Sequence, residues 1–275
     1  MRPDAGAPAT LVVLGHGSRC ADGVAEFWEL LDKVKALLPG VECAGGFIEL
    51  AQPTLAEALD GVAERGATEV VGVPLVLLGA GHLKQDGADA VAGANGRWNG
   101  SPSFRYAREL GVHPSVVSLA AERAREALSG AGSDGPAAVV LVGRGSTDPD
   151  ANSDLFKVAR LIEDPYGCPP AEAAFVSLSP PSVPEALERC RRLGAKRIAV
   201  VPYFLFDGVL VRRISEQAAE WAARSPGVQV AVAAHLGAAD AVAGLVAERY
   251  WQAVAGDVRM SCDMCSYRVR LPGYE

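Results

Sequence analysis

The sequence predicts an α/β protein made of two tandem duplicated domains, each a mainly parallel sheet flanked by helices. The first observation is a repeat: LVVLGHGSRCAD from Leu11 aligns with VVLVGRGSTDPD from Val139, and this offset of 128 residues holds without a gap as far as Val73 and Val201. The second is that candidate strands alternate with helical patterns in each copy. The third is the length, because 275 residues suit two domains of roughly 100 to 200 residues each.

Each copy begins with a short aliphatic strand, at residues 11–14 and 139–142. Neither run alternates with polar residues, which is typical of parallel strands covered on both faces. Apolar residues then recur at helical spacing until Pro39 and Gly40 stop the pattern, at Val24, Phe27, Trp28, Leu31, Val34 and Leu38.

The next helix of each copy starts at a capping box, formed by Thr54 with Glu57 and by Ser182 with Glu185. Apolar third strands are predicted at 69–78 and 197–206, and a fourth strand before His113 and before His235. A closing helix follows each of these histidines. The linker SGAGSDGPAA at 129–138 separates the copies, so the predicted domains are 9–128 and 137–256, followed by a tail at 257–275.

The composition limits the class of function. About half of the residues are hydrophobic and 21% are charged, which is ordinary for a globular protein, and the net charge of -7 disfavours nucleic acid as a partner. The first ten residues lack the apolar core of a signal peptide, and no apolar run approaches the roughly 20 residues of a membrane span. Four scattered cysteines do not form a secreted disulfide framework: Cys20, Cys43, Cys168 and Cys190. We therefore expect a cytoplasmic protein with no membrane partner.

The candidate site lies at strand ends of the first copy. Ligands of open α/β sheets bind beyond the carboxyl ends of the strands, where His16 and His82 are expected. At the constant offset, these histidines correspond to Arg144 and Leu210, and Glu49 corresponds to Ser177. Two imidazoles beside a carboxylate suit a transient divalent metal site or proton abstraction near neutral pH. The sequence therefore predicts one active site in the first copy, with His16, His82 and Glu49 as catalytic residues and both histidines as metal ligands.

Other interpretations of these motifs stay open. Each histidine could bond a loop carbonyl and do no chemistry, and Gly15–Ser18 could cradle a phosphate, although it matches neither common phosphate-binding pattern. A phosphoester hydrolase or nucleotide-binding protein is therefore one alternative. His113 and His235 precede the closing helix in both copies, so a structural role is the better interpretation for this pair.

Three stretches resemble the sirohydrochlorin chelatases of the class II, ATP-independent type, in their two-domain, single-chain form. These are LVVLGHGSR from Leu11, the Gln52–Thr54 motif and VPLVLLGAGHLKQD from Val73. The resemblance covers residues 11 to about 255. It implies insertion of Co2+ or Fe2+ into sirohydrochlorin for cobalamin or siroheme, with the metal-binding and catalytic histidines at His16 and His82.

The resemblance also implies an anionic tetrapyrrole substrate held between the two halves. Its carboxylates would pair with arginines, and we expect contacts from Ser18, Arg19, Gly81, Arg105 and Arg144; Arg97, Arg108, Arg212 and Arg213 are further candidates. The segment at 95–110 has no counterpart at the constant offset and is either a flexible wall over the macrocycle or an ordinary loop.

The tail carries Cys262 and Cys265 in a C-x-x-C motif. Two thiolates do not complete a zinc site or an iron–sulfur cluster, but some longer chelatases carry such a motif with a cluster. A cluster shared across a homodimer is therefore one interpretation; a redox pair, a metal-delivery tail and a docking peptide are the others.

We expect a cobaltochelatase, because the fused form with a cysteine tail is similar to the cobalt-type members. The alternatives are a ferrochelatase for siroheme and a non-catalytic carrier of tetrapyrrole or metal that uses the same histidines.

Overall fold

The structure is a computed structural model that describes residues 8–79, 81–130 and 135–257, with the backbone alone for residues 81–86 and 88. The chain forms two compact units. The first unit comprises Met1–His113 and Ala238–Glu275, and the second comprises Pro114–Gly237.

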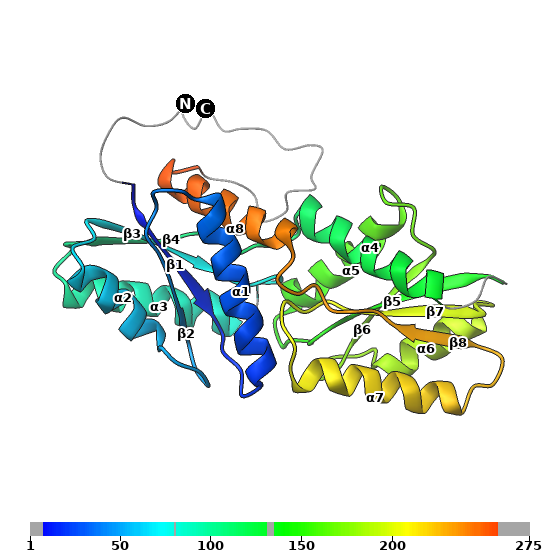
Figure 1. The fold of residues 1–275 in the computed structure, drawn as a ribbon. Coiled ribbons are helices and arrows are strands. Elements are labelled where there is room, and N and C mark those ends of the chain that lie inside the picture. Colours follow the sequence, from blue (N-terminus) through cyan, green and yellow to red (C-terminus); the bar gives the residue numbers. More distant parts are fainter. Residues whose placement is uncertain (1–7, 80, 131–134, 258–275) are drawn as a thin grey trace. The chain divides into compact units, whose positions relative to one another are not determined.

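The first unit is a four-stranded parallel sheet between helices. Its strand order is β2-β1-β3-β4, and the crossover helices are α1, α2 and α3, with α8 added from the end of the chain (Figure 1). The elements are β1 (Thr10–Gly15), α1 (Ala21–Leu37), β2 (Cys43–Phe47), α2 (Leu55–Glu64), β3 (Glu69–Pro74), α3 (Gly81–Arg97), β4 (Ser103–Tyr106) and α8 (Asp240–Val254).

The second unit repeats this architecture, with strand order β6-β5-β7-β8 and all pairs parallel. Its elements are α4 (Pro114–Gly130), β5 (Ala137–Gly143), α5 (Pro149–Glu163), β6 (Ala171–Phe175), α6 (Val183–Arg192), β7 (Arg197–Pro202), α7 (Val209–Ala223) and β8 (Gln229–Val232). The predicted α/β class and its duplication are confirmed.

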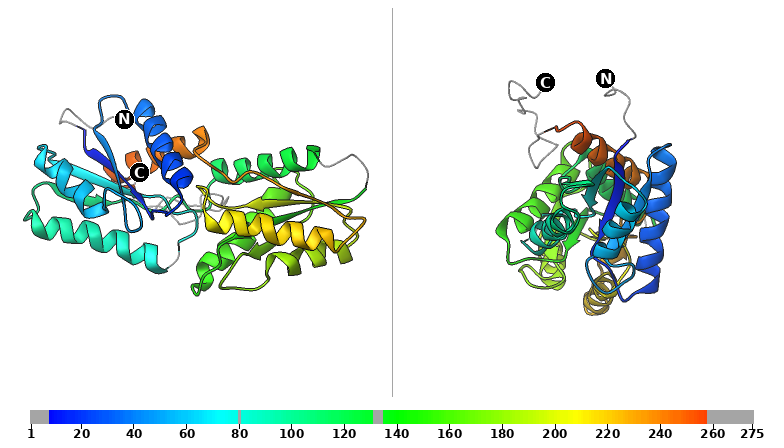
Figure 2. Two further views of the ribbon diagram at one scale, coloured as in Figure 1. Left: turned by 60° about the horizontal axis from the view of Figure 1, so that its bottom comes forward. Right: turned by 90° about the vertical axis from the view of Figure 1, so that its left-hand side faces the viewer.

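Both faces of each sheet are covered, which explains why the central strands are continuously apolar (Figure 2). In the first unit, every residue of β1 is buried. Val12 and Leu14 pack on one face against Leu59 of α2 and Val91 of α3. The opposite face receives Phe27 of α1, whose ring lies against the glycines of β1 and β2.

The capping boxes are confirmed. The Glu57 N–H donates to Thr54 Oγ1 at 3.2 Å, and the Thr54 N–H donates to Glu57 Oε2 at 2.7 Å, so α2 starts where the sequence predicts. Ser182 and Glu185 repeat the arrangement at the start of α6.

The closing helices are exchanged between the units. Helix α8 belongs to the second repeat but lies in the first unit, where the buried Tyr250 hydroxyl donates to the Ala9 carbonyl at 2.6 Å and Lys33 Nζ donates to the Ala238 carbonyl at 2.7 Å. Helix α4 belongs to the first repeat but lies in the second unit, where Arg125 donates to the Tyr166 carbonyl at 3.0 Å. The compact units therefore differ from the predicted domains 9–128 and 137–256 at these two helices, because each helix buries its apolar face on the sheet of the other repeat.

Other differences concern the ends of the third strands. β3 and β7 end at Pro74 and Pro202 instead of running to 78 and 206. The segment at 95–110 is not a simple loop: it holds the end of α3 and the whole of β4.

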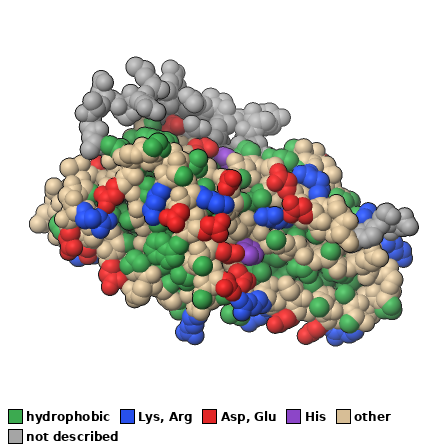
Figure 3. Space-filling view, viewed as in Figure 1, with side chains coloured by type: hydrophobic (Ala, Val, Ile, Leu, Met, Phe, Trp, Pro, Cys, Tyr) green, Lys and Arg blue, Asp and Glu red, His purple; other side chains and the backbone are tan. Residues whose placement is uncertain are grey.

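The helices within the described ranges lack the combination of length and hydropathy that crossing a bilayer requires. Acidic and basic side chains are interspersed on the face shown in Figure 3.

Candidate functional site

The site-bearing edge of the first unit is the carboxyl edge of its sheet. From β1 the chain crosses to β2 on one side, and β3 pairs on the other side of β1. The loops after β1 and β3 therefore leave the sheet in opposite directions, which makes their junction the usual ligand site of an open α/β sheet. His16 follows β1 directly, and His82 follows β3 after a short bend.

Backbone hydrogen bonds bring His16 and Glu49 together. The Ile48 N–H donates to the Gly15 carbonyl at 2.9 Å and the Glu49 N–H donates to the His16 carbonyl at 3.0 Å, so the parallel ladder continues beyond both strands. As a result, His16 Nε2 lies 3.5 Å from Glu49 Oε1. Both side chains are about half exposed, at 45% and 55%, so a bound molecule can reach them. An imidazole and a carboxylate at this separation can share a proton or offer N and O donors to one cation.

Steric contacts explain why Gly15 and Gly17, on either side of His16, are glycines. Gly17 has φ +97°, and a Cβ there would lie 1.7 Å from the Glu49 carbonyl oxygen. A Cβ at Gly15 would lie 2.9 Å from the Phe27 ring. Only glycine therefore allows the loop to approach β2 closely enough to hold the His16 and Glu49 side chains together.

His82 lies in the first turn of α3, which begins at Gly81. The Leu75 N–H donates to the Leu14 carbonyl at 2.9 Å, so β1 and β3 stay paired up to the points where the two histidine-bearing segments leave. The His82 side chain lies outside the described residues, and its convergence with His16 stays a prediction.

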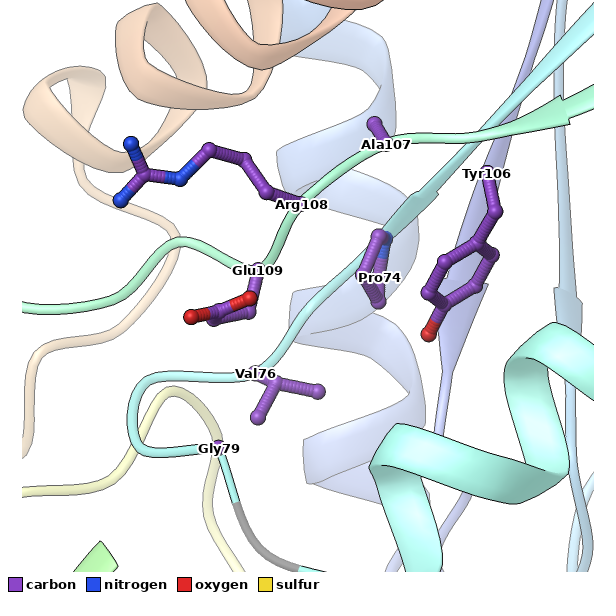
Figure 4. A pocket seen from close by; sticks show the side chains of 7 residues that line it. All are labelled: Pro74, Val76, Gly79, Tyr106, Ala107, Arg108 and Glu109. Atoms are coloured by element: carbon purple, nitrogen blue, oxygen red, sulfur yellow. The ribbon is translucent and has the colours of Figure 1, made fainter. Parts of the chain in front are cut away.

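A pocket opens at the carboxyl ends of β3 and β4. Its volume is about 360 Å³, within the range of small-molecule sites, and it is lined by Pro74, Val76, Gly79, Tyr106, Ala107, Arg108 and Glu109 (Figure 4). Burial raises the pKa of Tyr106 to about 12, and the charge of Glu109 acts in the same direction. The phenol therefore stays protonated at neutral pH, as a hydrogen-bond donor on the wall of the pocket.

The other residues predicted to contact the substrate lie in both units. Ser18 Oγ accepts from the Cys20 N–H at 3.0 Å, and Arg19 is exposed beside it. Arg105 pairs with Glu69 at 2.7 Å and Arg97 donates to Asp60 at 2.9 Å, so structural ion pairs account for both arginines. Arg144 lies in the second unit, at the position equivalent to His16.

The second unit keeps the loop geometry without the chemistry. Gly145 has φ +86° and approaches the Ser177 carbonyl as Gly17 approaches that of Glu49. Asn152 Nδ2 donates to the Ser146 carbonyl at 2.8 Å and to Ser179 Oγ at 3.1 Å, so the loop polar groups satisfy one another.

His113 belongs to the first unit, where its Nε2 lies 3.4 Å from Glu248 Oε2 of α8. The structural role expected for this histidine stays a prediction.

Sequence reasoning missed Tyr106 and Glu109 as pocket residues. Both belong to the segment at 95–110, and the fourth strand predicted before His113 was given no bounds within that segment. The strand is the signal that could have found them, because residues that end a strand next to β3 must lie at the ligand-binding edge. Cys262 and Cys265 lie outside the described residues.

A repeated α/β architecture, with a histidine and a carboxylate at the ligand-binding edge of one unit, defines a two-repeat protein of the chelatase-like fold. The sequence model of the CbiX family matches residues 10–127 and 138–253. The chain belongs to the CbiX family.

Individual proteins agree with this assignment. The sirohydrochlorin cobaltochelatase of Priestia megaterium is 33% identical over 267 residues, which cover 94% of this chain and 85% of the relative. A sirohydrochlorin ferrochelatase of the same organism is 31% identical over 202 residues, covering 74% of this chain and 75% of the relative. Among solved structures, SirB from Bacillus subtilis with Fe3+ matches with a TM-score of 0.78 and 26% identity, covering 90% of this chain and 96% of that one.

Proposed function

We propose that this protein is a sirohydrochlorin cobaltochelatase that inserts Co2+ into the tetrapyrrole without ATP, through His16, Glu49 and His82. The observation that carries the proposal is the His16–Glu49 pair, held 3.5 Å apart at the ligand-binding edge of a CbiX-family chain. In the second repeat the equivalent positions, after β5 and after β6, carry Arg144 and Ser177, which supports assigning the chemistry to the first repeat.

The reaction requires proton acceptors and a weak metal site. One Co2+ enters the macrocycle as two pyrrole N–H groups lose their protons, so the products are the metallated ring and two protons. His16 and Glu49 would accept these protons from a bound ring, and the half-exposed state of both side chains supports a route for the protons to water. A site with two histidines and few other donors binds the metal substrate less firmly than a closed four-ligand cage, which favours its release into the ring.

The pocket at the carboxyl ends of β3 and β4 would supply an apolar surface and polar donors. Pro74 and Val76 offer flat and branched apolar contacts, and Tyr106 offers a protonated hydroxyl. Arg108 lies on the same wall and carries the charge that a ring carboxylate would pair with.

We propose cobalt rather than iron because the cobaltochelatase relative matches more of the chain than the ferrochelatase does. The cobaltochelatase relative aligns over 94% of the chain and the ferrochelatase over 74%. Both metals must be compared, because imidazole and carboxylate ligands accept either.

The test is anaerobic absorbance of sirohydrochlorin mixed with Co2+, and separately with Fe2+, in the presence of catalytic amounts of protein. We expect multiple turnovers, faster with cobalt, and a fall in kcat of at least about 100-fold in Glu49→Ala, His16→Ala and His82→Ala. Ser177→Ala is the matched control for Glu49→Ala, since it alters the equivalent position of the other repeat, and it should keep the wild-type rate.

Stoichiometric pigment binding without a rate above the uncatalysed reaction would instead identify a carrier. Phosphate release, or thermal stabilisation by nucleotides, would favour the hydrolase or nucleotide-binding alternative.

Three further features stay predictions: the cytoplasmic location, the homodimer, and an iron–sulfur cluster at Cys262 and Cys265. A cluster takes four ligands, so two chains would have to contribute both thiolates each. Iron and sulfide are measured in anaerobically purified protein and in the Cys262→Ser variant, and light scattering gives the oligomeric state of both. Together these measurements check the cluster and the homodimer.

A further inference from the structure

Arg249 of α8 is a fully buried charged residue in the first unit, with 0% exposure. Its guanidinium donates from Nε to the Glu109 carbonyl at 2.9 Å, from Nη2 to the Leu110 carbonyl at 2.6 Å and from Nη1 to Gln252 Oε1 at 3.0 Å. The carboxylate of Glu248, which is 45% exposed, lies 3.8 Å from Nη1.

Such burial is costly unless the charge is well hydrogen-bonded. Here the partners that meet this requirement are main-chain carbonyls of the segment that leaves β4. A carbonyl engaged by a charged donor has its position fixed more firmly than one bonded to a neutral group. The guanidinium therefore holds the backbone at Glu109 and Leu110 in place.

The same segment forms one wall of the pocket. Tyr106, Ala107, Arg108 and Glu109 line it. From the other side, the Leu110 N–H donates to the carbonyl of Val76, another lining residue, at 3.0 Å. The wall is thus held between the end of β3 and Arg249.

We propose that Arg249 is a positioning residue for substrate binding, and that the second repeat in this way completes the site of the first. The inference rests on the proposed function, because it takes the pocket as the place where the macrocycle lies. Arg249 acts through the 106–110 wall and not on the reacting atoms.

The chain supplies a matched control. The closing helix of the first repeat carries Ala121-Glu122-Arg123, which corresponds to Ala247-Glu248-Arg249 of α8. Arg123 lies in the second unit, where its Nη1 pairs with Glu126 at 3.0 Å. It occupies the equivalent turn of an equivalent helix, in the unit without the histidine pair.

The experiment compares Arg249→Lys with Arg123→Lys. Lysine keeps the charge but cannot donate to both carbonyls in the fork geometry of a guanidinium. We expect the KM for sirohydrochlorin to rise about tenfold in Arg249→Lys while kcat stays within about twofold, which is the signature of lost binding without lost chemistry. Arg123→Lys should change neither constant.

A milder variant covers the case in which Arg249→Lys does not fold. Gln252→Met removes the acceptor that orients Nη1 and keeps the arginine, and it should raise KM about threefold. The proposal is overturned if kcat falls with KM unchanged, or if Arg123→Lys raises KM equally.

If the wild type binds the pigment but does not turn over, the proposed function fails, and the positioning role is then tested by the Kd for sirohydrochlorin from absorbance titration. An unchanged Kd in Arg249→Lys would refute it.

Discussion

At His16, the side chain is positioned by main-chain contacts on both sides of it. The carbonyl of His16 accepts from the Glu49 N–H, and Gly17 then turns with a positive φ against the Glu49 carbonyl. The catalytic pair therefore depends on the absence of a Cβ at one position.

The first prediction concerns that glycine. Gly17→Ala should destabilise the fold, because the φ of +97° alone costs roughly 1–3 kcal/mol and the new methyl must displace the Glu49 backbone. It should also abolish metal insertion by separating Glu49 from His16. Chemical denaturation and the anaerobic rate assay measure the two effects.

Gly145→Ala is the control, since a Cβ there would lie 2.1 Å from the Ser177 carbonyl at φ +86°. It should destabilise the protein similarly while the folded fraction keeps its rate. Equal loss of rate in both variants would show that strain alone, and not the His16–Glu49 geometry, explains the effect.

The sequence could mark His16 and Glu49 as a pair because of the duplication: each differs from its counterpart while the surrounding motif is kept, and the structure holds the two side chains 3.5 Å apart. Their catalytic role stays a prediction. The partner of Arg105 could not be predicted in this way, because it is Glu69, a residue distant in the chain that the sheet register brings near. Ion pairs of this kind have no local pattern to detect.

At the scale of elements, the two repeats start their first helices differently. Cys20 caps α1 with φ -82° and ψ 120° but makes no side-chain capping hydrogen bond. Asp148 caps α5 with φ -82° and ψ 114°, and its Oδ1 accepts from the Asp150 N–H at 3.0 Å. The first repeat thus lacks a side-chain cap on α1, although the backbone of Cys20 has nearly the same conformation as that of Asp148.

Cys20→Asp should therefore raise the free energy of unfolding by about 1 kcal/mol, because an aspartate can accept from an N–H of the first turn and complements the helix dipole. The melting temperature should rise by roughly 2–4 °C in a protein of this size. Cys20→Ala, which supplies no acceptor, should show no such gain, and a gain of the same size there would contradict the capping argument.

The capping boxes predict a dependence on pH. The Thr54 N–H and hydroxyl lower the pKa of Glu57 below its ordinary 4.5, and Ser182 does the same to Glu185. Because the folded state prefers the ionised carboxylate, this stabilisation is present above about pH 4.5 and is lost as the pH falls through the lowered pKa.

Glu57→Gln should thus flatten the fall in unfolding free energy between about pH 5 and 3. Urea denaturation at a series of pH values measures the slope. Glu64→Gln, at the other end of α2, removes an exposed carboxylate without removing a cap and should leave the slope as it is.

Elements with strong local signals were predictable from sequence, and α3 was not. α1 and α2 carry apolar stripes and start or stop signals, whereas α3 contains Gly81, Gly87, Gly93 and Gly96 and few large apolar residues. Gly87 is explained by a contact that no local pattern reveals, because a Cβ there would lie 2.6 Å from the Tyr106 hydroxyl. His82 was expected beyond the carboxyl end of a strand, and it lies in the first turn of the helix that follows.

At the scale of the whole molecule, the first unit is incomplete without the end of the chain. Val242, Leu245, Val246 and Tyr250 of α8 are buried there. Neither repeat alone therefore contains all of the helices that cover its sheet, a feature that sequence similarity between the repeats could not reveal.

A chain ending at Gly237 should lose the structure of the first unit and all metal insertion, because α1 and β3 would be left exposed. A chain ending at Asp257 keeps α8 and should retain the fold. Limited proteolysis with mass spectrometry would identify which residues become susceptible, and protection of residues 8–79 in the shorter chain would contradict the prediction.

The exchange of closing helices also has a consequence for how this gene can change. The loops of the second copy could change after duplication, and at the positions of His16 and Glu49 they now carry Arg144 and Ser177. Deleting that copy is a different matter, since it would remove a helix from the surviving copy. The second repeat can thus change in its loops but must persist as a whole, because the first unit includes its closing helix.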